Sequence, residues 1–192
     1  MQIKTIVTGE LDNNVYIVSH NNKAVIIDAA ANSNLIKEHL GDNQVVGILL
    51  THGHFDHIPY VDELTTVFKT KCYMHKSAYQ KLKDPYLNCS AYFNALVCDI
   101  EQKDCVFVED CDNIDLLDID IKVVHTPGHT DCGLCFVIDN NVFTGDTLFY
   151  KSHGRVDLPT SSMQSMKDSL NKLASNYKNY HFYPGHGKND II

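Results

Sequence analysis

The chain has 192 residues and a mass of 21.7 kDa, about the length of one domain, so we expect a single domain over residues 1–192. Its composition, 44% hydrophobic and 21% charged residues, is ordinary for a globular protein and excludes disordered, collagen-like and coiled-coil chains. The formal net charge of −8 disfavours a nucleic-acid backbone or an anionic membrane as partner, and we expect neither.

The first half of the chain alternates short apolar runs with stretches of helical spacing. Apolar runs bounded by turn residues predict strands over residues 3–7, 15–18, 24–27, 45–50 and 71–75. We expect the first three strands to form an antiparallel meander and the fourth, which is continuously apolar, to be buried on both faces. Helical spacing predicts helices over residues 32–40, 59–68 and from 77 onward. Residues 84–99 fit neither pattern.

The second half is dominated by strand patterns. They predict strands over residues 106–108, 114–117, 119–125, 134–138, 142–144 and 180–183. We expect a turn at Asn140 and Asn141 and a helix over residues 163–174, capped by Ser161 or Ser162. Two strand-rich halves that each carry helices predict an α/β (α+β) fold in which two sheets pack together with helices outside, in four layers.

The cysteines and the N-terminus indicate a cytoplasmic protein. Seven cysteines, odd in number and irregularly spaced, argue against a disulfide framework. The N-terminal residues lack the apolar stretch of a signal peptide, and no segment approaches the roughly 18–20 apolar residues of a membrane span. Cys132 and Cys135 are spaced like a redox or zinc pair, but they begin a predicted strand without a second pair, which favours buried small apolar side chains.

Three histidines and an aspartate follow the apolar run 45–50 in the pattern H-x-H-x-D-H. They are His52, His54, Asp56 and His57. Residues two apart in an extended stretch face the same way, so these side chains can converge on one point. The composition of the chain gives roughly a 0.4% chance that the pattern arises at random. It therefore predicts a metal site rather than a solvated polar loop.

Three later turns supply further candidate ligands, each placed just beyond a predicted strand. They contribute His129, Asp146 and His186, and each of these residues has a glycine beside it that permits a tight turn. Five histidines and two aspartates form about the ligand set of two divalent ions. We expect zinc, with iron or manganese as alternatives, because imidazole and carboxylate ligands suit all three metals.

These motifs, read as THGHFDHI, HTPGHT, TGDT and YPGHG, resemble the signature of the metallo-β-lactamase superfamily. Within it, they are similar to the glyoxalase II (hydroxyacylglutathione hydrolase) branch and its short single-domain relatives. The resemblance implies a four-layer αββα sandwich with the metals at one edge, between the sheets. It also implies how the ligands divide: His52, His54 and His129 on one ion, Asp56, His57 and His186 on the other, and Asp146 bridging both.

The resemblance implies a hydrolase that acts on a small-molecule thioester, most directly a hydroxyacylglutathione. Two cations would lower the pKa of a bridging water from 15.7 toward roughly 7, which supplies hydroxide at neutral pH. Asp146, which bridges the ions, and Asp56, which could orient that hydroxide, are the candidate catalytic residues. The chain shows no counterpart of the C-terminal helical domain that holds glutathione in full-length glyoxalase II, so an esterase or lactonase stays open. The alternative from another reaction class is a persulfide dioxygenase with one iron.

Three more residues are candidates around this site. Asp28 ends the strand 24–27, where the superfamily carries an aspartate that braces the metal loop. Arg155, the only arginine, is a candidate clamp for a substrate carboxylate, with a salt bridge to Asp157 as the alternative. Tyr92 is a candidate for lining the substrate cleft, with core or lid packing as the alternative. The sequence carries no signal about the oligomeric state.

Overall fold

The computed structural model describes residues 1–93, 95 and 100–189. The strands are β1 (Gln2–Thr8), β2 (Asn13–His20), β3 (Lys23–Ile27), β4 (Gln44–Leu49), β5 (Cys72–Met74), β6 (Cys105–Phe107), β7 (Asn113–Asp115), β8 (Asp120–His125), β9 (Leu134–Ile138), β10 (Asn141–Gly145), β11 (Leu148–Phe149), β12 (Ser152–His153) and β13 (His181–Pro184). The helices are α1 (Ser33–Leu40), α2 (Val61–Phe68), α3 (Lys76–Lys83) and α4 (Met163–Asn176), with short 3₁₀ turns η1 (Ser90–Tyr92) and η2 (Gln102–Asp104).

The strands form two sheets and a small hairpin. The first sheet has the order β1-β2-β3-β4-β5-β6, and the second has the order β13-β10-β9-β8-β7. Strands β1, β2 and β3 are antiparallel, as the sequence predicts, whereas β3 to β6 run parallel. The second sheet is antiparallel except where β13 joins β10 in parallel. The pair β11 and β12 forms the hairpin.

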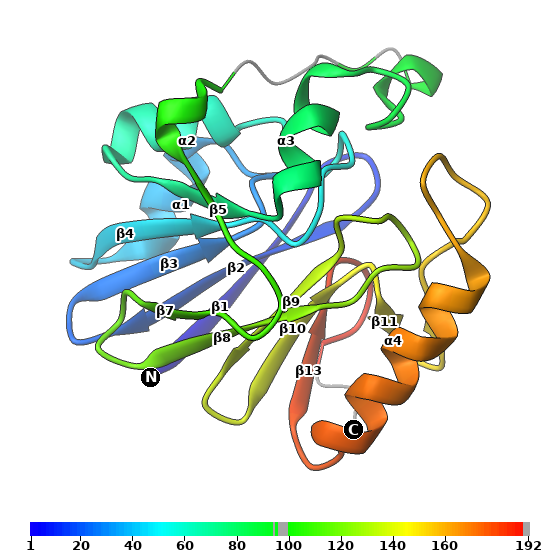
Figure 1. Ribbon diagram of the computed structural model, residues 1–192. Helices are drawn as coiled ribbons and strands as arrows, with labels where there is room; N and C mark the ends of the chain where they lie inside the picture. Colours follow the sequence, from blue (N-terminus) through cyan, green and yellow to red (C-terminus); the bar gives the residue numbers. More distant parts are fainter. Residues whose placement is uncertain (94, 96–99, 190–192) are drawn as a thin grey trace.

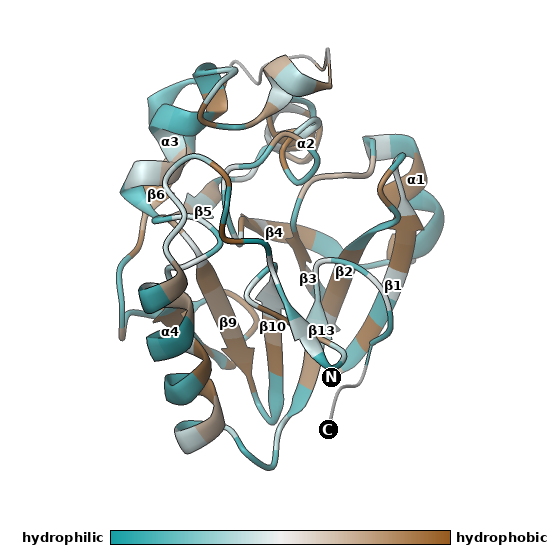
Figure 2. Cartoon of the chain, turned by 90° about the vertical axis from the view of Figure 1, so that its right-hand side faces the viewer, coloured by the Kyte–Doolittle hydropathy of each residue, from teal (hydrophilic) through white to brown (hydrophobic). Residues whose placement is uncertain are grey.

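Helices cover the outer face of each sheet. Figure 1 shows α1, α2 and α3 on the first sheet and α4 on the second. Alternate residues of one strand belong to different layers: Ile48 of β4 lies in the apolar cluster beneath the helices, and its neighbour Leu49 lies in the cluster between the sheets, which also contains Phe136. A third apolar cluster, which includes Leu173, joins the second sheet to α4. Figure 2 shows the apolar strands enclosed by helices with hydrophilic outer surfaces, so the predicted four-layer sandwich is confirmed.

Helix starts follow the capping chemistry of the sequence. Asn32 accepts a hydrogen bond from the backbone N–H of Leu35 and begins α1, and Ser162 rather than Ser161 caps α4. In the part of the chain that the structure describes, no helix is long and apolar enough to span a membrane.

Some predicted boundaries are wrong by one or a few residues. The turn between β9 and β10 lies at Asp139 and Asn140, since Asn141 already pairs with Ile138. Asp139 takes a positive φ of 52°, which aspartate tolerates in tight turns. The short pair β11 and β12 was not predicted. Of the segment 84–99, residues 90–92 form η1, and residues 94 and 96–99 lie outside the described part.

Candidate metal centre

The predicted ligands lie on loops that leave one edge of the two sheets. His52, His54, Asp56 and His57 follow β4, His129 follows β8, Asp146 follows β10, and His186 follows β13. Strand β4 belongs to the first sheet and the other three strands to the second, so the packing of the sheets brings distant segments of the chain together. All seven residues therefore meet at one place.

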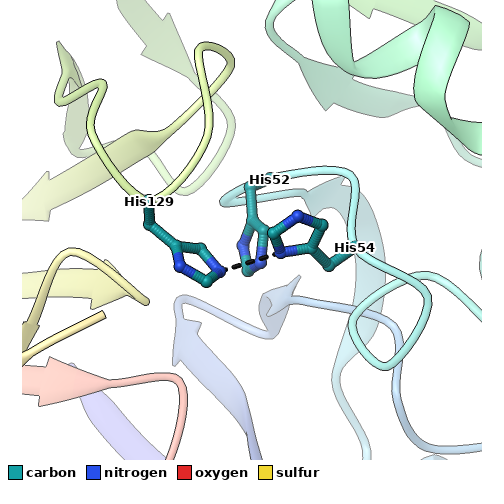
Figure 3. A group of neighbouring side chains, drawn as sticks. All are labelled: His52, His54 and His129. Atoms are coloured by element: carbon teal, nitrogen blue, oxygen red, sulfur yellow. Dashed lines mark hydrogen bonds between the residues drawn. The ribbon is translucent and has the colours of Figure 1, made fainter. Parts of the chain in front are cut away.

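His52, His54 and His129 form a first group (Figure 3). Their imidazole rings turn toward one another, and their centroids are 4.5–5.1 Å apart. The Nδ1 atom of His54 lies 2.8 Å from Nε2 of His129. All three residues are buried. One nitrogen from each can reach a common point, because the three ligand atoms lie within 4.8 Å of one another.

Asp56, His57 and His186 form a second group. Oδ2 of Asp56 lies 3.4 Å from Nε2 of His57 and 3.3 Å from Nε2 of His186. The same two imidazole nitrogens are 3.2 Å apart. Asp146 lies between the groups, with Oδ1 at 3.4 Å from Nε2 of His57 and Oδ2 at 3.4 Å from Nε2 of His129. These two groups contain the residues that the resemblance assigns to separate ions, and ligand atoms of His52, His57 and Asp146 form a further group that links them.

The donor atoms fit divalent cations. Nε2 of His52 and Oδ1 of Asp146 are buried and have no hydrogen-bond partner. Nδ1 of His54 and Nε2 of His129 face each other at 2.8 Å, so at least one of these two nitrogens is unprotonated and offers a lone pair, as a metal ligand does. Unsatisfied buried polar atoms cost free energy, which a cation among them would offset. Imidazole and carboxylate are ligands for zinc and iron.

The two groups differ in their electrostatics. Burial lowers the pKa of His52 and His54, that of His54 to about 3, and the neighbouring imidazoles lower both further. Burial also acts on His57, but the charges of Asp56 and Asp28 outweigh it and raise the pKa of His57. Burial alone would raise the pKa of Asp56. The charge of His57 and the hydrogen bonds that Asp56 accepts from His186 and Asn13 outweigh burial and hold that pKa below its usual range. The lowered pKa values favour neutral imidazoles at His52 and His54, whereas the second group places the charged carboxylate of Asp56 beside His57.

Each of four imidazoles is oriented by a hydrogen bond on its other nitrogen. The Nδ1 atoms of His52, His57, His129 and His186 lie, in that order, 3.0 Å from Oγ1 of Thr51, 2.7 Å from Oδ2 of Asp28, 2.9 Å from the carbonyl oxygen of Arg155 and 2.9 Å from that of Leu11. Such contacts fix the ring orientation of metal-binding histidines. The structure thus places Asp28 against a candidate ligand, where the sequence predicts a brace.

A cleft of about 580 Å³ opens over the two groups. Tyr92 and Phe93, which follow α3, form one wall, and Leu158 and Pro159, which precede α4, form another. Figure 1 shows both segments on the same side of the molecule. Tyr92 is 64% exposed, so it lies at the cleft surface and not in the core.

Arg155 also lines the cleft, but its guanidinium already has a partner. Nε and one terminal nitrogen donate to the two oxygens of Asp157 at 2.8 and 2.9 Å. Both side chains are mostly exposed. The salt bridge that the sequence offered as the alternative is therefore present, and a substrate carboxylate would have to compete with Asp157.

Cys132 and Cys135 do not form a pair. Cys132 packs in the layer between α1–α3 and the first sheet, whereas Cys135 packs in the layer beneath α4. Both are fully buried, and burial raises the pKa of both thiols, that of Cys135 to about 11. The prediction of buried small apolar side chains is confirmed.

The sequence did not indicate every residue around the site. The side-chain amide of Asn13 donates to Oδ2 of Asp56 at 2.8 Å, and the carbonyl of Leu11 faces His186. These contacts join positions 43 and 175 residues apart along the chain. No local spacing signals them, because they depend on how β2 packs beside the metal loops.

Comparison with known proteins identifies the family. Residues 8–186 match the sequence model of the metallo-beta-lactamase superfamily. PksB of Bacillus subtilis, a probable polyketide biosynthesis zinc-dependent hydrolase, is 29% identical over 167 residues, 85% of this chain and 67% of PksB. The BLEG-1 B3 metallo-beta-lactamase structure has a TM-score of 0.90 at 28% identity, over 97% of this chain and 92% of its own. The di-iron-bound form of TTHA1623 has a TM-score of 0.85 at 27% identity, over 98% and 94%. The chain belongs to the metallo-beta-lactamase superfamily.

Proposed function

We propose that this protein is a metal-dependent hydrolase that holds two divalent cations and cleaves small acyl thioesters. The observation that carries the proposal is the convergence of seven candidate ligand side chains, in two groups joined by Asp146, beside one cleft that five of them line. Two relatives support the metal: PksB is described as a probable zinc-dependent hydrolase, and TTHA1623 has a crystal structure in a di-iron-bound form. We propose zinc as the metal, with iron as the alternative.

The residues supply orientation and charge for hydrolysis. When bound, two cations acidify a water held between them and polarise the carbonyl of a substrate. Asp146 lies between the two groups, so one carboxylate can serve both cations. Asp56 is fixed by Asn13, and His57 is fixed by Asp28. These bonds hold the second group in one geometry before substrate arrives, which lowers the cost of reaching the transition state.

The composition of the cleft favours a substrate whose leaving group needs no proton. Apart from the candidate ligands, the described cleft residues with a titratable side chain are Cys89, Tyr92, Arg155 and Asp157. Tyr92 is 64% exposed, and in the described part of the chain it makes no hydrogen bond to a candidate ligand. Burial raises the pKa of Cys89, and Arg155 is engaged by Asp157. A thiolate leaves without protonation, whereas an amine does not. The apolar walls suit a small acyl group. A carboxylate of glutathione would have to displace Asp157 from Arg155 in order to bind that guanidinium.

Thiol release from S-D-lactoylglutathione by the zinc-loaded protein tests this proposal. We expect release that falls more than about 100-fold in His54→Ala, beyond the range of changes to residues behind the ligands. His39→Ala, a histidine of α1 far from the cleft, is the control and keeps full activity. If a protein that holds two ions releases no thiol, glutathione thioesters are excluded. Oxygen uptake with glutathione persulfide then tests the one-iron dioxygenase.

A further inference from the structure

Asn13 contacts the second group of ligands directly. This residue begins β2 and is 2% exposed. Its side-chain amide donates to Oδ2 of Asp56 at 2.8 Å. That oxygen is the one that lies nearest the imidazole nitrogens of His57 and His186, at 3.4 and 3.3 Å. Asn13 therefore fixes the carboxylate oxygen that points into the candidate ion position.

The residues on either side of Asn13 hold His186. The carbonyl oxygen of Leu11 lies 2.9 Å from Nδ1 of His186, and the backbone of Asn13 pairs with that of His186 in an antiparallel bridge. The backbone N–H of Asn14 donates to the carbonyl of Gly185 at 2.7 Å. One short segment, residues 11–14, thus orients two of the three side chains in the second group.

The first group is oriented by other parts of the chain. Thr51 precedes His52 in the same loop, and the carbonyl of Arg155 faces His129. None of the hydrogen bonds described for His52, His54 or His129 comes from residues 11–14. A change at Asn13 should therefore reach the second group alone.

We propose that Asn13 is a positioning residue that sets the affinity of the second group for its ion through Asp56, without affecting the first group. The inference rests on the proposed function in one respect, namely that each group takes an ion. An amide that donates to a carboxylate stops its rotation and leaves it ionised, so the ligand needs no rearrangement when the ion arrives. Contacts of this kind behind a ligand are worth 10- to 100-fold in metal affinity.

A zinc titration of the metal-free protein, in competition with a chromophoric chelator, measures the affinity for the first and for the second zinc ion. Asn13→Ala removes the donor, and Asn13→Leu removes it while keeping a side chain of similar size and adding no charge. We expect the weaker of the two zinc-binding steps to lose about 10- to 100-fold in affinity in both variants, and the tighter step to stay within twofold. Asn141→Ala is the matched control, since its amide donates to the carbonyl of Ile138 in a distant hairpin.

Three outcomes would overturn the proposal. They are an unchanged second step in both variants, an equal loss in both steps, and a single step in the wild-type protein. Melting of the metal-free variants, measured first, separates a selective effect from general unfolding, and Asn13→Leu, which is closer in size, serves if Asn13→Ala does not fold. The titration uses no substrate, so a failure of thioester hydrolysis leaves this result standing, and the reverse also holds.

Discussion

Asp28 joins the loop after β4 to the candidate ligand His57, so its removal should lower both the stability of the metal-free protein and its affinity for zinc. It is 2% exposed, takes a positive φ of 60°, and directly follows β3. Oδ1 accepts hydrogen bonds from the backbone N–H of Thr51 at 2.8 Å and from its hydroxyl, while Oδ2 lies 2.7 Å from Nδ1 of His57. Both carboxylate oxygens of Asp28 are therefore engaged by hydrogen-bond donors. The change Asp28→Asn keeps the shape but leaves one acceptor oxygen.

The cost of Asp28→Asn follows from these bonds. The amide group of asparagine must face a donor, either the backbone N–H of Thr51 or Nδ1 of His57, so one bond to a charged acceptor is lost. Such a bond is worth about 1.5–3 kcal/mol, and the free energy of unfolding of the metal-free protein should fall by that amount. Loss of the anchor on His57 should weaken zinc binding about 10- to 100-fold, or roughly 1.4–2.7 kcal/mol.

Denaturant unfolding of the metal-free protein and a zinc titration measure the two effects. Asp118→Asn is the control, because Asp118 also takes a positive φ, of 58°, but is exposed and pairs with Lys23 at the surface. We expect this control to change stability by less than about 1 kcal/mol. An Asp28→Asn protein with the stability and zinc affinity of the wild type would refute the reasoning.

Three further changes follow from the structure. In Gly185→Ala, the new Cβ would overlap Oδ1 of Asp146 and lie 2.8 Å from Cε1 of His57, so zinc content and thiol release should both fall. Gly187→Ala is the control, because its Cβ meets no atom within 4 Å. This control should keep its zinc and lose only stability, because the residue has a positive φ. Burial and the stacked ring of His125, 4.7 Å away, lower the pKa of His75. The unfolded chain therefore binds more protons than the fold below about pH 6.5, and stability falls with acid. His75→Asn should lose less melting temperature than the wild type between pH 7.5 and 5.5, by at most about 4 °C. Chelation of zinc present at about 1,000 times its dissociation constant should cost about 4 kcal/mol, or roughly 8–16 °C in melting temperature, and an unchanged value would contradict a structural contribution of the metal.

The convergence of the candidate ligands could be predicted because its signal in the sequence is local. His52, His54, Asp56 and His57 lie in one short loop after a strand, where spacing alone brings side chains together. His129 and His186 stand beside glycines at turns, and the repetition of that pattern supported each assignment. Candidate metal ligands at strand ends can therefore be recognised in a sequence from short clusters of histidine and aspartate.

The contacts behind the ligands left no such trace. Asn13 reaches Asp56 only because the fold brings the first residue of β2 to the loop after β4, although β3 separates the two strands in the sheet. Arg155 shows the opposite problem, since its position in the sequence suited both a carboxylate clamp and a salt bridge. The structure shows the bond to Asp157, which only side-chain geometry could decide.

The layers of the fold were easier to predict than its strand order. Residues such as Ile48 and Leu49 alternate between two apolar layers, and continuous apolar runs indicate strands buried on both faces. The parallel pairing of β13 with β10 joins segments far apart in the sequence, and periodicity carries no information about partners. The two-residue strands β11 and β12 are too short to produce a period.

The central claim is that seven side chains hold two ions next to the cleft. A crystal structure of the zinc-loaded protein, with anomalous scattering recorded on both sides of the zinc absorption edge, tests it most directly. We predict two peaks, one within reach of His52, His54 and His129, and the other within reach of Asp56, His57 and His186. A single peak in crystals grown with excess zinc, or peaks away from these side chains, would contradict the account.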